Sequence, residues 1–251
     1  MPQYLLRFDA DRQVWVANLL LQGFFMTLRL TLVAGLMAAV VGVLLGMARV
    51  SGDPFLRLAS RTYVELVRNT PPLVFIFIFY FFISSQIMPL LGIGAAVRSA
   101  DPATLELVSW VLGDPRLVEN VLAGAICLAM LEAAYVAEIV RGGIRGVARG
   151  QIEAADALGL SPFDRMRDVV LPQALRRMLP PLASQFISLV KDSSIVSLIS
   201  VQELTFAAQN VVTATRRVFE IWITVAAMYF AVCFLLSLAF RRLERPDAAG
   251  R

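Results

Sequence analysis

The chain has 251 residues, of which 58% are hydrophobic and 17% charged, with a formal net charge of +4. A soluble domain is nearer half apolar and a quarter charged, so an integral membrane protein is expected. The small net charge, without a basic run between aromatic residues, argues against a nucleic-acid partner. The absence of histidine, with two cysteines far apart in apolar runs, argues against a metal site, a haem ligand or histidine-based catalysis.

Five apolar runs reach the length of about 18 residues that crossing a bilayer requires. They are residues 19–50, 73–91, 117–140, 182–200 and 218–240. The first is long for a bilayer, which predicts tilt or extension beyond it, and it lacks the short core and cleavage site of a signal peptide. The second contains FIFIFYFF, whose unbroken apolar length favours a helix over a strand. We therefore expect one all-α transmembrane domain over residues 1–251, with about five transmembrane helices.

The distribution of arginine predicts the orientation. Fifteen arginines fall in the segments after the first and third runs and in the tail, whereas six fall on the opposite side. Because positive residues favour the cytoplasm, the N-terminus is expected outside and the C-terminus inside. The outer loop from Gly92 to Glu119 is long, and Asp101 followed by Pro102 predicts the start of a short helix there.

A block rich in charged residues separates the third and fourth apolar runs, within the predicted cytoplasmic segment 141–180. In it, Gly159 predicts the end of one short amphipathic helix, and residues 161–162, Ser-Pro, the start of the next. Pro172 and the pair at 180–181 predict two further breaks. One interpretation is a helical loop lying in the headgroup layer, and the other is a docking element for a cytoplasmic partner. The acidic residues argue mildly against simple adhesion to anionic lipid.

Ionisable residues inside spans mark function by default, because they are costly there. Lys191 and Asp192 lie about eleven residues into the fourth span, or roughly 16 Å, and Glu132 lies at comparable depth in the third. In one interpretation, Lys191 simply neutralises one of the two carboxylates. In the other, these residues line the translocation path together with Ser188 and Ile195, Lys191 attracting a substrate carboxylate and Asp192 its ammonium group.

Two further groups of residues lie near the inner face. Glu138 and Arg141, three residues apart at the end of the third span, are expected to pair on one helix face, worth a few tenths of a kcal/mol. The sequence RNTPP, residues 68–72, begins the second span. Its prolines suit the first turn of a helix, and a role in an inner gate is the alternative.

The sequence EAADALGLSPFDRMRDVVLPQAL, residues 153–175, resembles the EAA loop of ABC importer permeases. Four further blocks, in the same order, resemble the polar amino acid uptake subfamily. They are LLQGFFMTLRLTLVAG, YVELVRNTPPLV, EAAYVAEIVRGGIRGVARGQ and QFISLVKDSSIVSLISVQEL. One departure is RNTPP where RGTP is commoner, a difference that bears on substrate choice rather than on the family.

This resemblance implies a type I ABC importer permease in the bacterial inner membrane. Two such subunits, identical or paralogous, would pair with two ATP-binding cassette ATPase subunits and receive a polar amino acid from an extracytoplasmic binding protein. The block would be the ATPase-coupling element. In it Gly159 would permit a sharp turn, Glu153 would hold the loop's shape, Ala154 and Ala155 would allow close approach, and Pro172 would complete the motif.

ATP and its magnesium ion would be bound by the partner, and no cofactor is expected in this chain. The only lysine is Lys191, in LVKDS, so the chain has no Walker A sequence and cannot supply an ordinary P-loop. An ion-gradient-driven carrier of amino acids or other small solutes is the leading alternative, although five spans without an internal repeat disfavour it. An intramembrane enzyme, in which Ser-Lys chemistry at Lys191 is formally possible, and a non-catalytic scaffold are the others.

Overall fold

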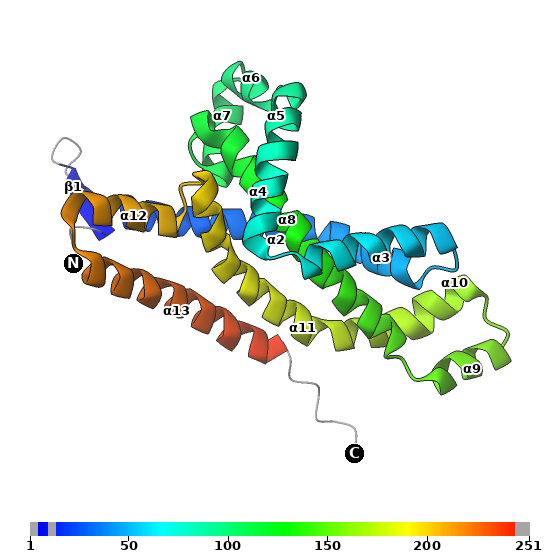
Figure 1. Ribbon diagram of the computed structural model, residues 1–251. Coiled ribbons are helices and arrows are strands. Elements are labelled where there is room, and N and C mark those ends of the chain that lie inside the picture. The colour runs from blue at the N-terminus through cyan, green and yellow to red at the C-terminus, as the bar shows by residue number, and fades with distance from the viewer. Residues whose placement is uncertain (1–4, 10–13, 244–251) are drawn as a thin grey trace.

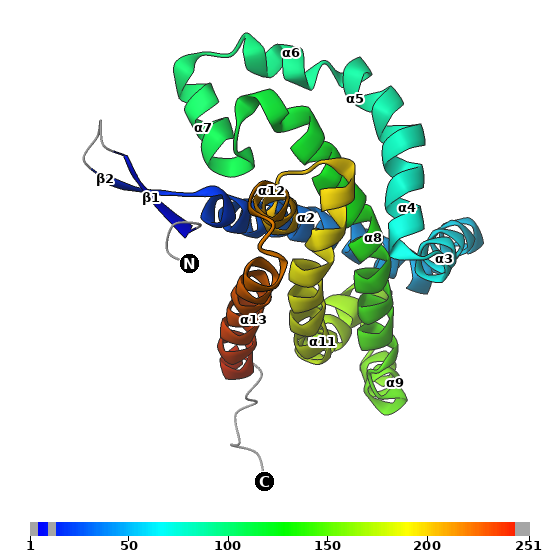
Figure 2. The same cartoon turned by 60° about the vertical axis from the view of Figure 1, so that its left-hand side comes forward.

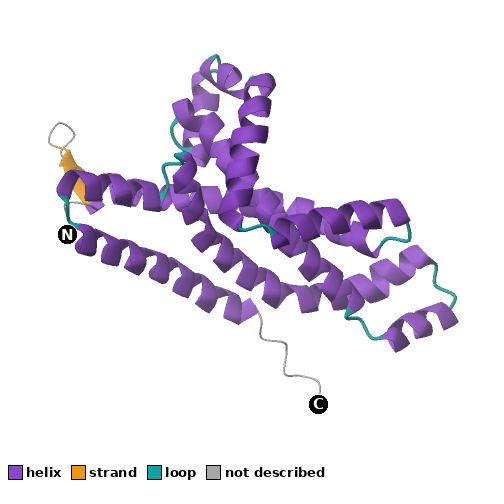
Figure 3. Ribbon diagram, in the orientation of Figure 1, coloured by secondary structure: helices purple, strands orange, loops and turns teal. Residues whose placement is uncertain are grey.

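The computed structural model describes residues 5–9 and 14–243, and nearly all of them are helical (Figure 3). Four helical stretches are long and apolar enough to cross a membrane, and a bent pair of helices is a candidate for a fifth span. The prediction of an all-α membrane protein with about five spans is confirmed. The structure adds a short antiparallel hairpin, β1 (Leu6–Asp9) with β2 (Val14–Ala17), that the sequence did not predict. Arg12, Arg245 and Arg251, used to predict the orientation, lie outside the described residues.

The helical elements in chain order are α2 (Leu19–Val50), α3 (Pro54–Asn69), α4 (Pro72–Ile78), η1 (Phe79–Ser84), α5 (Ser85–Leu91), α6 (Ile93–Arg98), α7 (Pro102–Leu112), η2 (Pro115–Leu117), α8 (Val118–Arg145), α9 (Arg149–Ala157), α10 (Pro162–Asp164), η3 (Arg165–Val170), α11 (Leu171–Asp192), η4 (Ser193–Ile199), α12 (Leu204–Thr215) and α13 (Val218–Leu243). Two of them, η1 and η3, are π-helical turns, and η2 and η4 are 3₁₀-helical. At one end of the molecule lie α3, α9 and α10, well away from α6 and α7 (Figure 1).

The centre of the fold is the contact between α2 and α8. On α2, Ala38, Gly42 and Gly46 recur every fourth residue on the buried face. A Cβ atom placed on Gly42 would lie 2.5 Å from the Cβ of Val136, and one on Gly46 would lie 2.6 Å from the Cβ of Val140. Small residues at this spacing let two helix backbones approach closely, which is a common source of stability between helices in membranes.

The segment FIFIFYFF forms α4 and η1, as the sequence predicted. Pro72 is the first residue of α4, so the prolines of RNTPP do begin this helix. The axis of α4 and the residues that follow it is bent by 115° from that of α3. In Figure 2, α4 runs roughly parallel to α8, α11 and α13, while α2 runs across them behind α12.

The helix α7 begins where the sequence predicted. The carboxylate of Asp101 accepts hydrogen bonds from both the hydroxyl and the backbone N–H of Thr104, at 2.7 and 3.1 Å. These two hydrogen bonds hold the pKa of the exposed Asp101 below its usual range. Pro102 occupies the first turn of the helix, where its missing N–H costs nothing.

The predicted breaks at Pro172 and at Pro180–Pro181 are wrong, because helical structure runs without interruption from Pro162 to Ile199. Pro172 lies in the first turn of α11, directly after the wider π-helical turn of η3, where a proline is tolerated. Pro180 and Pro181 lie inside α11, which buries Met178 against α8. Packing of this kind holds a proline-containing membrane helix together. The helix that contains the predicted fourth span therefore starts well before residue 182.

A buried carboxylate ties α2, α12 and α13 together. Glu203 is fully buried and caps α12 by accepting a hydrogen bond from the backbone N–H of Phe206 at 2.9 Å. Its other oxygen accepts the hydroxyl groups of Tyr229, at 2.8 Å, and Thr27, at 3.3 Å. Leu20 and Ile221, also fully buried, pack in the apolar cluster around these helices. This corner is thus held by both apolar contacts and a satisfied polar network.

Candidate functional site

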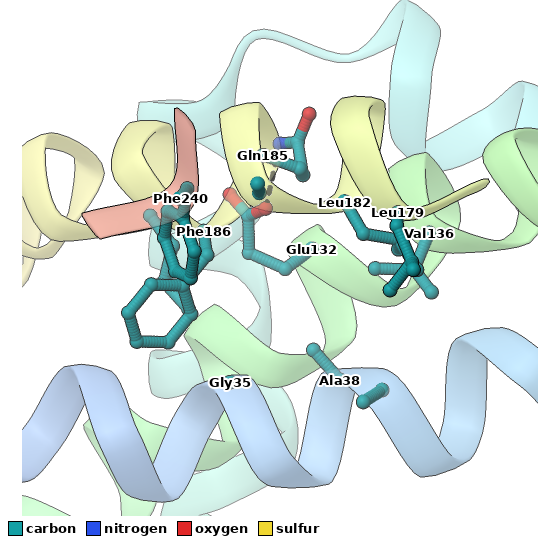
Figure 4. A pocket seen from close by; sticks show the side chains of 12 residues that line it. Gly35, Ala38, Glu132, Val136, Leu179, Leu182, Gln185, Phe186 and Phe240 are labelled. Carbon is teal, nitrogen blue, oxygen red and sulfur yellow. Dashed lines mark hydrogen bonds between the residues drawn. The ribbon is translucent and has the colours of Figure 1, made fainter. Parts of the chain in front are cut away.

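A cavity of about 300 Å³ lies between α2, α8, α11 and α13 (Figure 4). Most of its wall is apolar, and Glu132 and Gln185 are the two polar side chains in it. The apolar side of the wall includes Ala38, Val136, Leu179, Leu182, Phe186 and Phe240. A mainly apolar cavity with a few convergent polar groups is the usual form of a small-molecule site.

Glu132 is the most unusual residue of this cavity. It is 1% exposed, on α8, and its Oε2 accepts a hydrogen bond from Nε2 of Gln185 at 2.7 Å (Figure 4). No N–H or hydroxyl group among the described residues donates a hydrogen bond to its other oxygen, Oε1. A buried carboxylate oxygen without a donor is costly, and proteins keep such an atom where something else can complete it.

Lys191 and Asp192 are the last two residues of α11, and the carboxyl group of Asp192 lies close to that of Glu132. The carboxyl groups of Asp192 and Glu132 are near enough to interact electrostatically, and Lys191 attracts Asp192. Lys191 itself is exposed, and within the described residues it makes no ion pair as short as 4.0 Å. Lys191 still acts on the charge of Asp192 from a distance, so both interpretations from sequence stay predictions.

The other polar and candidate residues of this helix differ in burial and in hydrogen bonding. Ser188 is half-buried, and Ile195 packs against the central apolar cluster rather than standing free. Ser193 and Ser197 donate their hydroxyl groups to carbonyls of their own helix, both at 2.7 Å, so they offer little to a ligand. Sequence reasoning missed Gln185. Its position three residues before Ser188 and seven before Asp192 places all three on one helix face, a signal that was available.

Glu138 pairs with Arg141 as predicted, with Oε2 accepting from Nε and Nη2 at 2.9 and 2.7 Å. It also pairs with Arg49 of α2, and Arg68 of α3 lies 3.9 Å away. The side chains of Arg49 and Glu138 are only 11% and 18% exposed, so this is more than a surface pair. Glu138 thus joins three helices, which the spacing within a single helix could not reveal.

The predicted coupling element folds as a helix, a sharp turn and a second helix. Gly159 has φ +74°, a conformation that other residues adopt only with strain. Its N–H donates to the carbonyl of Asp156, and the N–H of Leu160 donates to that of Ala155. This pair of hydrogen bonds is the glycine-ended C-cap that satisfies a helix's last carbonyls. Ser161 then caps the next helix by accepting from the N–H of Asp164, so the predicted stop and start are both confirmed.

An ion pair between Asp156 and Arg165 joins the two arms of this turn. Sequence reasoning assigned the shape of the loop to Glu153 instead. In the structure Glu153 pairs with Arg149, one turn away on the same exposed helix, which adds little to stability. Ala155 is buried beneath the loop and Ala154 is exposed.

The outer surface of the same turn is apolar and uncovered. Leu158 is 81% exposed and Phe163 is 71% exposed, and they belong to the end of the chain's fold where α9 and α10 lie (Figure 1). Large apolar side chains this exposed beside a rigid turn are typical of a contact surface for another protein.

The arrangement of helices and the sequence both match known transport proteins. Residues 32–246 match the family described as "Binding-protein-dependent transport system inner membrane component". The chain is 34% identical over 233 residues to the glutamine transport system permease protein GlnP of Escherichia coli (strain K12), covering 92% of this chain and 94% of that one. It is 36% identical over 225 residues to the probable glutamine ABC transporter permease protein GlnP of Bacillus subtilis (strain 168), covering 88% and 90%.

A solved structure shares the fold. A chain of an amino acid ABC transporter crystallised with histidines superimposes with a TM-score of 0.73, at 32% identity, over 90% of this chain and 93% of that one. With a family match over most of the sequence and several membrane-length helices, the chain belongs to the inner-membrane components of binding-protein-dependent transport systems, and it is a multi-pass permease of the ABC transporter type.

Proposed function

We propose that this chain is the permease subunit of an ATP-driven importer for a polar amino acid, delivered by an extracytoplasmic binding protein. Glutamine is the first substrate to test, because the curated relatives above are glutamine permeases. In this proposal the N-terminus lies outside, and α9 with α10 faces the cytoplasm. ATP and magnesium are held by a separate ATPase.

The observation that best supports a substrate site is the unsatisfied Oε1 of Glu132, which lines the cavity and whose carboxyl group lies close to that of Asp192. An amino acid carries one ammonium and one carboxylate group. Two neighbouring carboxylates repel each other, and a ligand ammonium group would relieve that repulsion. The exposed ammonium of Lys191, costly in a span unless it meets water or an anion, would take the substrate carboxylate.

A second permease copy, identical or paralogous, would cover the surfaces that this chain leaves open. The helix α13 buries 6% of its most apolar stretch and exposes Phe230, Phe234 and Leu235. Because Lys191 is exposed in the single chain, the translocation path would be completed between two copies. Whether the second copy is the same chain is tested by co-purifying two differently tagged forms.

For coupling, the turn around Gly159 would seat in a groove of the ATPase, with Leu158 and Phe163 as its apolar contacts. A rigid, glycine-capped turn suits this role because little conformational entropy is lost on binding. Closure of the ATPase would move the turn, and with it the helices that line the cavity.

The first experiment measures uptake of labelled glutamine by the assembled transporter in proteoliposomes. Lys191→Met and Asp192→Asn should raise the KM for uptake at least tenfold, and Lys191→Arg should be closer to wild type. The matched control is Gln209→Ala, an exposed polar residue on α12 away from the cavity. Unchanged affinity in both neutralised variants would remove Lys191 and Asp192 from the substrate site while leaving the permease role intact.

The second experiment purifies the tagged chain from its native membrane in mild detergent and identifies what accompanies it. A P-loop ATPase in stoichiometric amount is expected with wild type and should be lost with Gly159→Asp. The control Gly52→Asp changes an exposed glycine that has no neighbouring atom within 4 Å. An intact complex in the Gly159 variant would exclude an essential docking role for that turn. No ATPase in any sample, with uptake driven by an ion gradient, would favour a secondary carrier.

A further inference from the structure

A second pocket, of about 540 Å³, lies where the C-terminal ends of α2 and α8 meet the first half of α3. Its lining is strongly basic, with apolar side chains at its edge. The charged residues are Arg49, Arg57, Arg61, Arg141, Arg145 and Glu65. Pro54 and Leu58 form the apolar edge. The pocket belongs to the same end of the molecule as α9 and α10 (Figure 1).

The carboxylates near this pocket do not balance its arginines. Glu65 pairs with Arg61 at 2.7 Å, and Glu138 is already engaged by two other arginines of the lining. Arg57 and Arg145 are exposed and make no ion pair with any described residue. A concave surface with an excess of guanidinium groups attracts anions, and guanidinium binds the oxygens of phosphate through paired hydrogen bonds.

The helix α3 has three stripes, and their order indicates which anion fits. One stripe, with Ser60, Val64 and Val67, is buried against the rest of the protein. The next, at helical spacing, contains Arg57, Arg61 and Glu65. The third contains Phe55, Leu58 and Leu66, which are 75%, 64% and 65% exposed. The charged stripe therefore lies between the protein and an uncovered apolar stripe.

This order suits a lipid better than a soluble anion. A free phosphate or nucleotide would use the arginines and leave the apolar stripe in water. A phospholipid has a phosphate for the arginines and an acyl chain for the apolar stripe. Helices with a basic edge beside an apolar face lie in the membrane interface for this reason.

We propose that this pocket binds the phosphate headgroup of an anionic phospholipid, with the acyl chain lying against Phe55, Leu58 and Leu66. The bound lipid would hold α3 against the ends of α2 and α8. It is a site separate from the cavity at Glu132, and it does not depend on which substrate the protein transports.

The test titrates phosphatidylglycerol, and phosphatidylcholine as the neutral comparison, into delipidated full-length protein with its co-purifying subunits. Bound lipids are counted by native mass spectrometry. Wild type should retain phosphatidylglycerol in preference to phosphatidylcholine. Arg57→Gln with Arg61→Gln should weaken phosphatidylglycerol binding about 30-fold, because each arginine near the membrane surface raises the affinity about fivefold. The control, Arg176→Gln with Arg177→Gln, removes the same charge from exposed positions on α11 outside the pocket.

Leu58→Gln separates a lipid from a soluble anion, because it alters the apolar stripe and leaves all the arginines in place. It should weaken phosphatidylglycerol binding and leave the binding of inorganic phosphate unchanged. Equal loss in both double variants would mean attraction by overall charge and would overturn the proposal. So would displacement of the lipid by millimolar inorganic phosphate with no effect of Leu58→Gln, or loss of the ATPase from the Arg57 and Arg61 variant with lipid binding unchanged.

Discussion

The contact between α2 and α8 has no room for a methyl group at Gly42, and the cost of adding one follows from the structure. Carbon atoms in contact prefer a separation of about 3.5–4.0 Å, whereas the new Cβ would lie 2.5 Å from the Cβ of Val136. The helices would have to separate by about 1 Å. Overpacking of this kind costs about 1–3 kcal/mol, and alanine returns about 0.5–1 kcal/mol through its better helix propensity.

We therefore expect Gly42→Ala to lower the free energy of unfolding by about 1 kcal/mol, the middle of the difference between these two ranges. The measurement is loss of helical circular dichroism during titration with sodium dodecyl sulfate in mixed micelles. Gly142→Ala is the matched control, because Gly142 is also helical but has no neighbouring atom within 4 Å. The control should gain about 0.5–1 kcal/mol.

A second substitution in the contact between α2 and α8 tests whether the helices move apart. If α2 moves away once to accommodate Gly42→Ala, the same movement also makes room at Gly46. The double variant with Gly46→Ala should then cost less than the sum of the single variants, by about 1 kcal/mol. If the Gly42→Ala protein is as stable as wild type while Gly142→Ala gives the expected gain, the contact between α2 and α8 is not as tightly packed as described.

Three other substitutions test contacts that hold the helices together. Replacing Asp156 with Asn breaks its pair with Arg165, and a double-mutant cycle should give a coupling energy below about 1 kcal/mol because both groups are partly exposed. Replacing Glu203 with Ala removes a helix cap and the acceptor of two hydroxyl groups, and should lower the free energy of unfolding by about 2–4 kcal/mol. Replacing Glu138 with Gln leaves the partly buried guanidinium of Arg49 without its counter-charge, at a cost of about 1–3 kcal/mol.

The same denaturation measurement serves all three, with exposed carboxylates as controls. Asp168→Asn, Glu220→Ala and Glu106→Gln should each change the free energy of unfolding by less than about 0.5 kcal/mol. A coupling energy well above 1 kcal/mol at Asp156 would show that its pair is better shielded than its exposure indicates. Losses at Glu203 or Glu138 no larger than in the controls would contradict their roles as links between helices.

Features that depend on a few neighbouring residues were predictable from the sequence. The helix of FIFIFYFF, the cap at Asp101 and the stop at Gly159 each follow from local propensity, capping and backbone freedom. Glu138 with Arg141 was predicted because three-residue spacing places two side chains on one helix face. In each of these cases the physical cause lies within about one or two helical turns of the residue concerned.

Contacts between segments far apart in the chain could not be predicted in this way. The hydrogen bond from Gln185 to Glu132 joins residues 53 positions apart, and its partners become neighbours only once α8 packs on α11. The prediction of a helix break at Pro180 and Pro181 was wrong because it used local preference alone. Their local preference is to break a helix, but packing of α11 against its neighbours outweighs that preference.

The unbroken helix from Pro162 to Ile199 has a mechanical consequence. Its first residues adjoin the exposed turn at Gly159, and its later residues include Gln185 and Asp192 beside the cavity. At 1.5 Å per residue, about 45 Å of continuous helix separates Pro162 from Asp192. A force applied at the turn would therefore reach the cavity as a tilt or slide of a single lever, without a relay of intervening side chains.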